Sequence, residues 1–543
     1  MNKAMICKPM PFVLAVLVLA FNSGAIAQSP GDTAGITQFP IQCNGSTGHR
    51  IALDANGTTH VVWTRSYPNL NNRSIWYNCY SNGDFSFPAG GTSISRANRD
   101  GYCQLAIDDQ NRACVVFHNT AHAPADSMWL ATDAFSCFGT PGFSHIPDRF
   151  DGHGYMWPYI ARSGNGDLQV IETDTTIHIF AYTRSTDGGT SWTSLQVVDS
   201  INFISPIVVA SPVSDKVCIA YTRTHFDPVT WTTSDLMYVQ SSDGRTWDFA
   251  NGLMNVTHYG IDSDSVMAGF DIDAIYDYND NLHFVWQARS QSSLIQYQTK
   301  LMHYGVATGI VSQIGEATPP TWPLTGCAFP SYEWHFAQVS LAVQQGTNNL
   351  YAGYTDFDST DCSQIGYANG DIYMNFSYDS GITWTPNIDI TNSRTPLCAS
   401  GDCASDEWPS MAERVDDYAH IFYECETGGG TISDNPMLYL RYYVIPINTG
   451  DGQTAPKSFT LSQNYPNPFN SATTISFTLE KDAFVNLTVY GVTGAKIATL
   501  ANGRMNAGRH EIGWNADDIS SGIYYYRLTT GKDYLIKKML VLK

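Results

Sequence analysis

The chain has 543 residues, of which 13% are aromatic and only 15% are charged, with 44 glycines and a formal net charge of −21. This length exceeds one small core and this composition is typical of turn-rich β proteins, so we expect at least two domains and exclude a helical or disordered chain. From Lys457 onward 10 basic residues outnumber 6 acidic ones, so the acidic excess precedes that residue and disfavours nucleic acid as a partner.

The first 27 residues predict a signal peptide. Lys3 and Lys8 precede the apolar run PFVLAVLVLAF, and the small residues Ala25 and Ala27 suit cleavage before Gln28. No other apolar run approaches the roughly 20 residues that a membrane span needs. We therefore expect an exported protein without a transmembrane anchor.

One hairpin pattern recurs along the chain, with copies that begin at positions 50, 104, 159, 207, 273, 339 and 410. The clearest copies are RIALDANGTTHVVW, QLAIDDQNRACVVF and DAIYDYNDNLHFVW, in which a turn of Asp, Asn or Gly separates two apolar segments. Each copy predicts a β-hairpin, and the spacing suits a four-stranded propeller blade. The sequence thus predicts an all-β fold with a β-propeller over residues 28–447 and seven blades, or six as the alternative.

The last part of the chain predicts a separate β module. Residues 448–457 form a polar stretch with Gly and Pro that is typical of a linker. Short alternating segments such as TTISFTL and FVNLTVYGV then follow between turn signals. They predict an immunoglobulin-like β-sandwich over residues 458–543.

A second motif, Ser-x-Asp-x-Gly-x-x-Trp, occurs at residues 185–192 and 377–384, with a shorter relative at 241–247. Its carboxylate can accept backbone N–H bonds in a hairpin turn, its glycine permits positive φ, and its tryptophan can pack between blades. A turn recurs in every blade whereas an active site is single, so we interpret the motif as structural. Its members are Ser185, Asp187, Gly189, Trp192, Ser241, Asp243, Trp247, Ser377, Asp379, Gly381 and Trp384. The motif resembles the Asp box, or BNR repeat, of sialidase-like β-propellers.

Hairpin direction predicts where a ligand would bind. If the motif joins the third and fourth strands of a blade, the starts of first strands and the ends of second strands lie on the opposite face. The expected ligand-binding residues on that face are Arg65, Trp157, His225, Asp271, His335, Asp356 and Trp408. Aromatic residues there can stack on sugar rings, and packing at the rim is the alternative.

Sialidases hold the carboxylate of their substrate with three arginines, and the resemblance implies Arg50, Arg223 and Arg289 for that role. Residues 64–73, where the family has its acid/base aspartate, contain no carboxylate. Binding of a glycan or another extracellular polymer without chemistry is therefore the first prediction. The alternative is an exo-α-sialidase or a related glycoside hydrolase with its acid in another loop, for which the candidates are Glu172, Glu333 and Glu424.

Eleven cysteines remain after the signal peptide, so at least one is unpaired. Cys398 and Cys403 are close enough for a loop disulfide, whereas Cys114 and Cys218 lie in apolar patterns that indicate buried thiols. We expect no cofactor. Acidic turns at residues 277–281 and 356–361 offer oxygen ligands for a structural calcium ion, with ordinary turn formation as the alternative.

The C-terminal segments SFTLSQNYPNPFNSATTISFTL and SSGIYYYRLTTGKDYLIKKMLVLK resemble the type A sorting domain of the type IX secretion system. This resemblance implies interaction with the secretion machinery and passage across the outer membrane. It also implies that the protein is then released or attached to the cell surface. We expect the exported protein to be a monomer.

Overall fold

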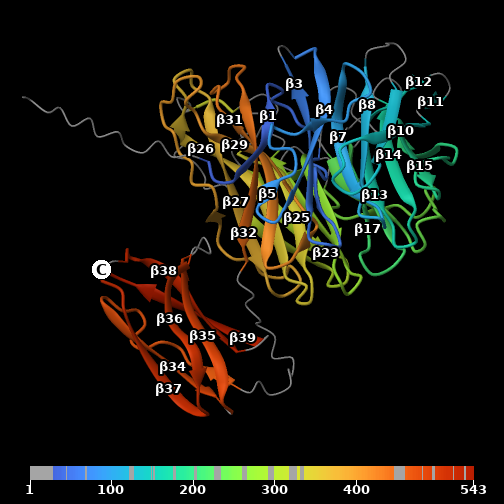
Figure 1. The fold of residues 1–543 in the computed structure, drawn as a ribbon. Coiled ribbons are helices and arrows are strands. Elements are labelled where there is room, and N and C mark those ends of the chain that lie inside the picture. Colours follow the sequence, from blue (N-terminus) through green and yellow to red (C-terminus); the bar gives the residue numbers. More distant parts are fainter. Residues whose placement is uncertain are drawn as a thin grey trace, which may run out of the picture.

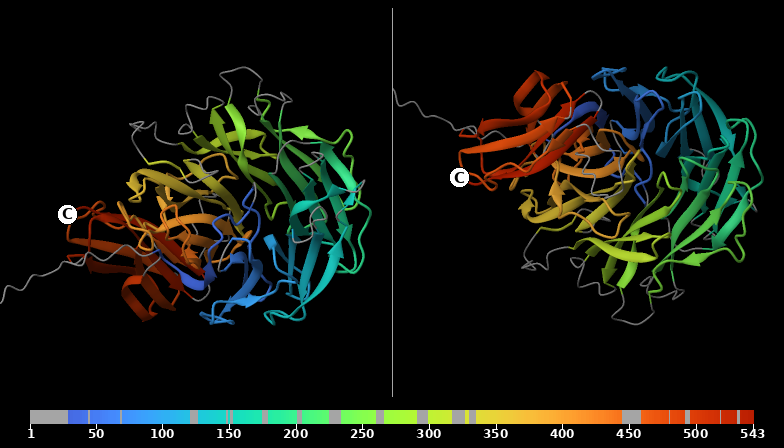
Figure 2. Two further views of the ribbon diagram at one scale, coloured as in Figure 1. Left: turned by 90° about the horizontal axis from the view of Figure 1, so that it is seen from above. Right: turned by 90° about the horizontal axis from the view of Figure 1, so that it is seen from below.

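The computed structural model describes residues 29–43, 46–67, 70–120, 127–147, 149–150, 153–174, 179–200, 205–224, 234–259, 266–290, 299–316, 327–329, 335–444, 459–479, 481–491, 496–517, 519–530 and 533–543. All secondary-structure elements in these residues are β-strands (Figure 1). Seven sheets of four or five strands surround a central axis, and two more sheets form a C-terminal unit (Figure 2). The predicted all-β fold and the prediction of seven blades are confirmed.

The first three blades follow one another in chain order, each with its first strand innermost. Blade 1 consists of β2 (Ile51–Leu53), β3 (Thr59–Ser66), β4 (Arg73–Ser81), β5 (Asp84–Phe85) and β6 (Thr92–Ser93). Blade 2 consists of β7 (Asp100–Ile107), β8 (Ala113–Asn119), β9 (Ser127–Asp133) and β10 (Pro141–Ile146). A short hairpin of β11 (Arg149–Phe150) and β12 (His153–Gly154) precedes blade 3. Blade 3 consists of β13 (Met156–Arg162), β14 (Leu168–Asp174), β15 (Ile179–Ser185) and β16 (Gln196–Ser200).

The next three blades repeat this arrangement. Blade 4 consists of β17 (Pro206–Ala210), β18 (Val217–Thr224), β19 (Ser234–Ser241) and β20 (Met254–Asn255). Blade 5 consists of β21 (Val266–Tyr276), β22 (Leu282–Ser290), β23 (Thr299–Gly305) and β24 (Ile310–Glu316). Blade 6 consists of β25 (Phe336–Gln344), β26 (Leu350–Cys362), β27 (Ala368–Ser377) and β28 (Ile388–Asp389), with β30 (Arg414–Val415) beside β25.

Blade 7 closes the ring with strands from both ends of the propeller. It contains β29 (Ser405–Met411), β31 (Tyr418–Glu426), β32 (Asn435–Tyr443) and, as its outer strand, β1 (Asp32–Thr37), which pairs antiparallel with β32. At the seam between blades 7 and 1, Trp63 is fully buried and its ring lies 6.0 Å from that of Phe422. Burial of such a side chain contributes about 2–3 kcal/mol, so the seam is packed as a core as well as hydrogen-bonded.

The innermost strands of blades 2, 3, 5, 6 and 7 each contain a β-bulge near their N-terminal end. Four residues in these bulges adopt positive φ: Tyr102 (57°), Trp157 (53°), Gln338 (61°) and Trp408 (57°). Bulges redirect side chains, and positive φ is uncommon for residues other than glycine. In four of these five blades the bulge therefore places one unusual side chain at the same end of the central axis, the end where first strands begin.

The Ser-x-Asp turns lie at the opposite end of the blades. The Asp187 carboxylate accepts the backbone N–H of Ser191 at 2.8 Å and the Ser185 hydroxyl at 2.8 Å. Gly189 has a φ of +90°, and a Cβ there would lie 2.2 Å from Leu130 of the preceding blade, so both backbone conformation and space require glycine. The same carboxylate pattern recurs at Asp243 and Asp379.

The tryptophans of these turns pack against the preceding blade. The Trp247 ring of blade 4 lies 5.2 Å from that of Tyr182 in blade 3. Trp384 of blade 6 lies 5.3 Å from His303 in blade 5, and Trp192 of blade 3 packs on the cluster that contains Leu130. The turns therefore stabilise the interfaces between blades.

The C-terminal unit is a β-sandwich with its own core. One sheet contains β33 (Phe459–Leu461), β34 (Ala472–Leu479) and β37 (Gly508–Asn515), and the other contains β36 (Lys496–Met505), β35 (Ala483–Gly491), β38 (Gly522–Thr530) and β39 (Asp533–Val541). Phe477, Leu487 and Leu528 are fully or almost fully buried between them. The predicted signal peptide and linker lie outside the described residues.

Candidate ligand-binding pocket between blades 6 and 7

A cavity of about 400 Å³ opens between blades 6 and 7 at the end of the ring where first strands begin. Its walls come from the start of β27, the bulge of β29, the loop between β31 and β32, and the segment that follows β1. The Trp408 and Tyr367 rings line it together with the amides of Asn369 and Asn435. This size and this mixture of aromatic faces and polar groups are typical of a small-molecule or sugar site.

Two carboxylates, Glu407 and Glu426, also line the cavity. Glu407 accepts the Ser405 hydroxyl at 2.7 Å, and Glu426 accepts the backbone N–H groups of Gly428 and Gly429 at 2.8 and 2.9 Å. Burial raises the pKa of Glu426, and these N–H groups partly offset the rise. Among the described residues that line the cavity, none is a lysine or an arginine, so the pocket is acidic.

A third carboxylate lies beneath the pocket. Glu424 pairs in register with Glu407 across β31 and β29 and is 1% exposed. Asn435 and Gln42 donate to its two oxygens at 2.7 and 3.1 Å. Burial raises the pKa of Glu424 to about 8 against these hydrogen bonds, so it holds a proton at neutral pH. Because Glu424 is covered, we assign it to the support of the pocket and not to its lining.

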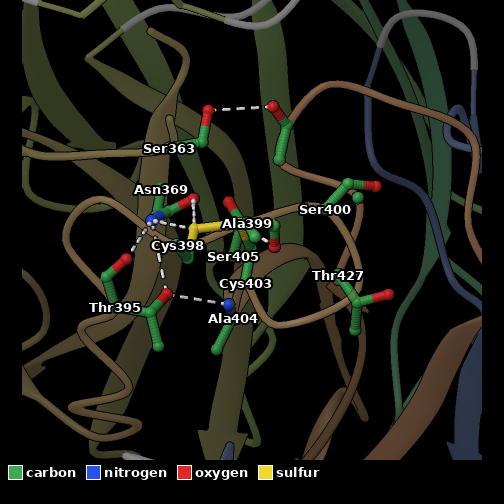
Figure 3. Close-up of a disulfide and its surroundings, with 12 residues drawn as sticks. Ser363, Asn369, Thr395, Cys398, Ala399, Ser400, Cys403, Ala404, Ser405 and Thr427 are labelled. Carbon is green, nitrogen blue, oxygen red and sulfur yellow. Dashed lines mark hydrogen bonds between the residues drawn. A yellow bond between two sulfur atoms is a disulfide. The ribbon is translucent and has the colours of Figure 1, made fainter. Parts of the chain in front are cut away.

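The disulfide between Cys398 and Cys403 fastens two walls of the pocket (Figure 3). On one side the Asn369 amide donates to the Cys398 sulfur at 3.6 Å. On the other side the backbone N–H of Cys403 donates to the Thr427 carbonyl, and the Ser400 and Thr431 hydroxyls are 2.6 Å apart. The predicted loop disulfide is therefore confirmed, and it links blade 6 to the loop of blade 7.

The remaining cysteines either form disulfides or are buried outside them. Two further disulfides join Cys79 to Cys137 and Cys327 to Cys362. Five cysteines outside these disulfides are buried, which confirms the prediction for Cys114 and Cys218; the others are Cys43, Cys103 and Cys425.

The three arginines implied by the sialidase resemblance have separate partners in the described part of the chain. Arg50 is fully buried, where it donates to the Trp408 carbonyl and lies over the Phe422 ring, and burial lowers its pKa. Arg223 is exposed and pairs with Asp199 at 3.3 Å. Arg289 is buried over the Phe270 ring, 4.8 Å from its centroid.

Other predicted residues lie around the same end of the ring. Burial raises the pKa of Asp271 to about 7, although the Arg289 charge opposes that rise. The His335 Nε2 lies 2.9 Å from an Asp356 carboxylate oxygen, and Glu172 is fully buried in β14. His225 and Glu333 lie outside the described residues.

Three of the residues predicted to lie on the ligand-binding face are aromatic or contact an aromatic ring. Trp408 lines the pocket and donates through its indole to the Pro40 carbonyl at 2.9 Å. Trp157 accompanies the bulge of β13, and its backbone N–H donates to His118. Arg65 stacks on the Trp76 ring at 4.2 Å.

The sequence-based predictions did not include most of the residues that line the pocket. Glu407 adjoins Trp408 in the segment DEWP and Glu426 lies two residues after Glu424, so both were next to residues singled out for other reasons. Tyr367 and Asn369 follow a long strand of blade 6 and carry no signal of their own.

The predicted acidic turns have protein partners. Asp277 accepts the backbone N–H groups of Asn279 and Asn281 at 2.9 and 2.8 Å, and Asp358 pairs with Arg394 at 3.0 Å. Within the described ranges no group of three or more His, Cys, Asp or Glu residues is arranged to hold a metal ion. No helix among these residues is long and apolar enough to cross a membrane.

Comparison with solved structures finds distant propellers. An ulvan lyase of a polysaccharide lyase family is 11% identical over 77% of this chain and 96% of that one, with a TM-score of 0.47. The α-L-arabinanase of Penicillium chrysogenum is 11% identical over 63% of this chain and 93% of that one, with a TM-score of 0.41. An α-L-arabinofuranosidase of Fusarium graminearum is 9% identical over 63% of this chain and 93% of that one, with a TM-score of 0.38. These similarities are too distant to assign a ligand.

The C-terminal sandwich has a specific relative. Residues 463–542 match the family described as the secretion system C-terminal sorting domain, whereas no curated protein matches the chain. These residues span most of the sandwich from β34 to β39. The protein is therefore a cargo of the type IX secretion system, which carries it across the outer membrane to the cell surface or the extracellular space.

Proposed function

We propose that the propeller binds an extracellular glycan in the pocket between blades 6 and 7. The observation that carries this proposal is one cavity that combines the Trp408 and Tyr367 rings with amide and carboxylate groups. Aromatic faces stack on the apolar faces of sugar rings, and amides both donate to and accept from hydroxyl groups.

The negative charge of the pocket favours neutral sugars over anionic ones. Glu407 and Glu426 can accept hydrogen bonds from sugar hydroxyls, and a hydrogen bond to a charged group contributes about 1.5–3 kcal/mol. The same carboxylates repel an anionic group at this position. The sugar residue that occupies the pocket is therefore neutral.

A glycoside hydrolase of sialidase type is the alternative function. Glu407 and Glu426 both accept hydrogen bonds from protein groups, and Glu424 is covered. This arrangement supports carboxylates that position a ligand, and it favours binding over turnover.

The test measures retention of the exported chain on immobilised laminarin, xylan, mannan and arabinan, and turnover of a fluorogenic sialoside. At least one neutral polymer retains the protein, and Tyr367→Ala weakens that binding about tenfold because a stacking face is lost. Tyr418→Ala, at the opposite end of β31, is the matched control and leaves binding unchanged. Retention on none of the four polymers, or sialoside turnover, would overturn the proposal.

We also propose that the three Ser-x-Asp turns are Asp boxes with a structural role. Their carboxylates are occupied by bonds within the turn, as for Asp379 with the Thr383 N–H and hydroxyl at 2.9 and 2.6 Å. They lie on the face away from the pocket, which supports a role in blade packing.

A further inference from the structure

Arg73 lies at the same end of the ring as the pocket, on the side of blade 1 that faces blade 2. Its guanidinium lies 5.2 Å from the centroid of the Phe39 ring and 5.6 Å from that of Tyr102. It donates to the Thr120 hydroxyl at 3.1 Å and hydrogen-bonds Tyr102, and Gly101 leaves space beside it. A guanidinium has five N–H donors, so donors remain for a ligand.

This arginine has no carboxylate partner among the described residues, although the chain has a large acidic excess. Some arginines elsewhere in the propeller pair with aspartates at 2.7–2.8 Å, as Arg112 does with Asp108 and Arg184 with Asp167. Asp100, the nearby acid, is buried and accepts the backbone N–H groups of residues 96 and 97 instead. Arg73 is thus a half-buried cation held by aromatic rings rather than by an opposite charge.

Residues 38–40 join the surroundings of Arg73 to the pocket. Gln38 and Pro40 line the pocket, while Phe39 between them packs edge-on against Tyr102 at 5.7 Å. Trp157 extends the aromatic surface, with its ring 6.5 Å from that of Tyr102. One short segment therefore separates an acidic pocket from a cationic aromatic surface.

We propose that Arg73 binds the carboxylate of a uronic acid residue in a glycan whose neighbouring neutral sugar occupies the pocket between blades 6 and 7. The planar fork of a guanidinium matches a planar carboxylate, and the Phe39 and Tyr102 rings hold the group at this position without neutralising its charge. This proposal rests on the proposed function for the neutral residue and adds the charged one.

Affinity electrophoresis and calorimetry test this with the full exported chain and three polymers: rhamnogalacturonan, in which galacturonate alternates with neutral rhamnose, laminarin, and the sulfated polymer carrageenan. Arg73→Gln weakens binding to rhamnogalacturonan about tenfold and leaves laminarin binding unchanged, because only the uronate loses its charged partner. Arg112→Gln removes the same charge from the opposite face and changes neither. Arg73→Lys, which keeps the charge but not the fork, recovers only part of the affinity, and it replaces Arg73→Gln if that variant does not fold.

Equal losses in Arg73→Gln and Arg112→Gln, or no loss for rhamnogalacturonan in Arg73→Gln, would overturn the proposal. A loss confined to carrageenan would also overturn it, since it would assign the site to sulfate. Tyr367→Ala tests the neutral pocket separately. If laminarin binding is unchanged in Tyr367→Ala, the proposed pocket is wrong, and this result does not depend on the effect of Arg73→Gln.

Discussion

His49 lies between carboxylates from two other blades. Its Nδ1 is 3.3 Å from Glu413, which follows β29 of blade 7, and its Nε2 is 3.7 Å from Asp273 in β21 of blade 5. Burial alone lowers the pKa of His49, but the two carboxylates outweigh it and raise the pKa to about 9. A charged imidazole therefore links blade 1 to blades 5 and 7.

The His49 link predicts a stability that depends on pH. The folded-state pKa exceeds the unfolded value of about 6.5, so the stabilisation is fully present below pH 6.5 and is lost as pH rises through about 9. It amounts to at most about 3 kcal/mol, less the screening by solvent that reaches Glu413. Melting temperatures from pH 6 to 10 measure it. His49→Gln flattens this decline, whereas His258→Gln, at an exposed site, leaves it unchanged; equal profiles in the three proteins would contradict the assignment.

At the scale of elements, two disulfides have different structural roles. The Cys398–Cys403 bond closes a short loop whose neighbours Asn369 and Thr431 line the pocket. The Cys79–Cys137 bond joins β4 of blade 1 to the turn after β9 of blade 2, across 58 residues. The first bond therefore holds the pocket walls, and the second holds two blades together.

This difference predicts that removing either bond lowers stability, but that only one of the removals weakens glycan binding. Replacement of Cys398 and Cys403 by Ser weakens retention on the neutral glycan and costs about 2 kcal/mol of unfolding free energy, because a short loop constrains the unfolded chain little. Replacement of Cys79 and Cys137 by Ser costs about 4 kcal/mol and leaves retention unchanged. Denaturant unfolding and affinity electrophoresis measure the two effects. Parallel losses of binding in both variants would show that the Cys398–Cys403 loop does not shape the pocket.

At the scale of the whole molecule, the sorting domain contacts the face of the propeller opposite the pocket. Arg527 of β38 donates to the Tyr443 hydroxyl at the end of β32, and the Tyr443 and Tyr490 rings stack at 5.9 Å. Figure 1 shows the sandwich near this end of β32. The pocket and Arg73 therefore stay accessible while the domain engages the secretion machinery.

Removal of residues 459–543 tests this arrangement. The shortened chain is no longer exported, because the sorting domain is absent, but the propeller retains its glycan binding, since the sandwich has a separate core. Fractionation of cells and medium measures export, and affinity electrophoresis of the purified propeller measures binding. Weaker binding by the shortened chain would show that the sandwich contributes to the site.

The sequence by itself determined the features that depend on neighbours along the chain. Each blade begins with a local hairpin, and the glycine at position 189 is required by its own turn, so repeats and turns could be read one at a time. The sorting domain was likewise evident from a continuous segment. These predictions needed no knowledge of how blades pack.

Only the tertiary structure decided the closure of the ring and the composition of the pocket. β1 pairs with β32 from the far end of the propeller, and the pocket combines residues near positions 40, 368, 408 and 430. Arg50, expected to contact a ligand, is buried beneath Trp408, whereas Arg73 stacks on aromatic rings at the rim. Which side chains meet at the axis depends on bulges and on packing between blades, and those interactions join residues that are distant in sequence.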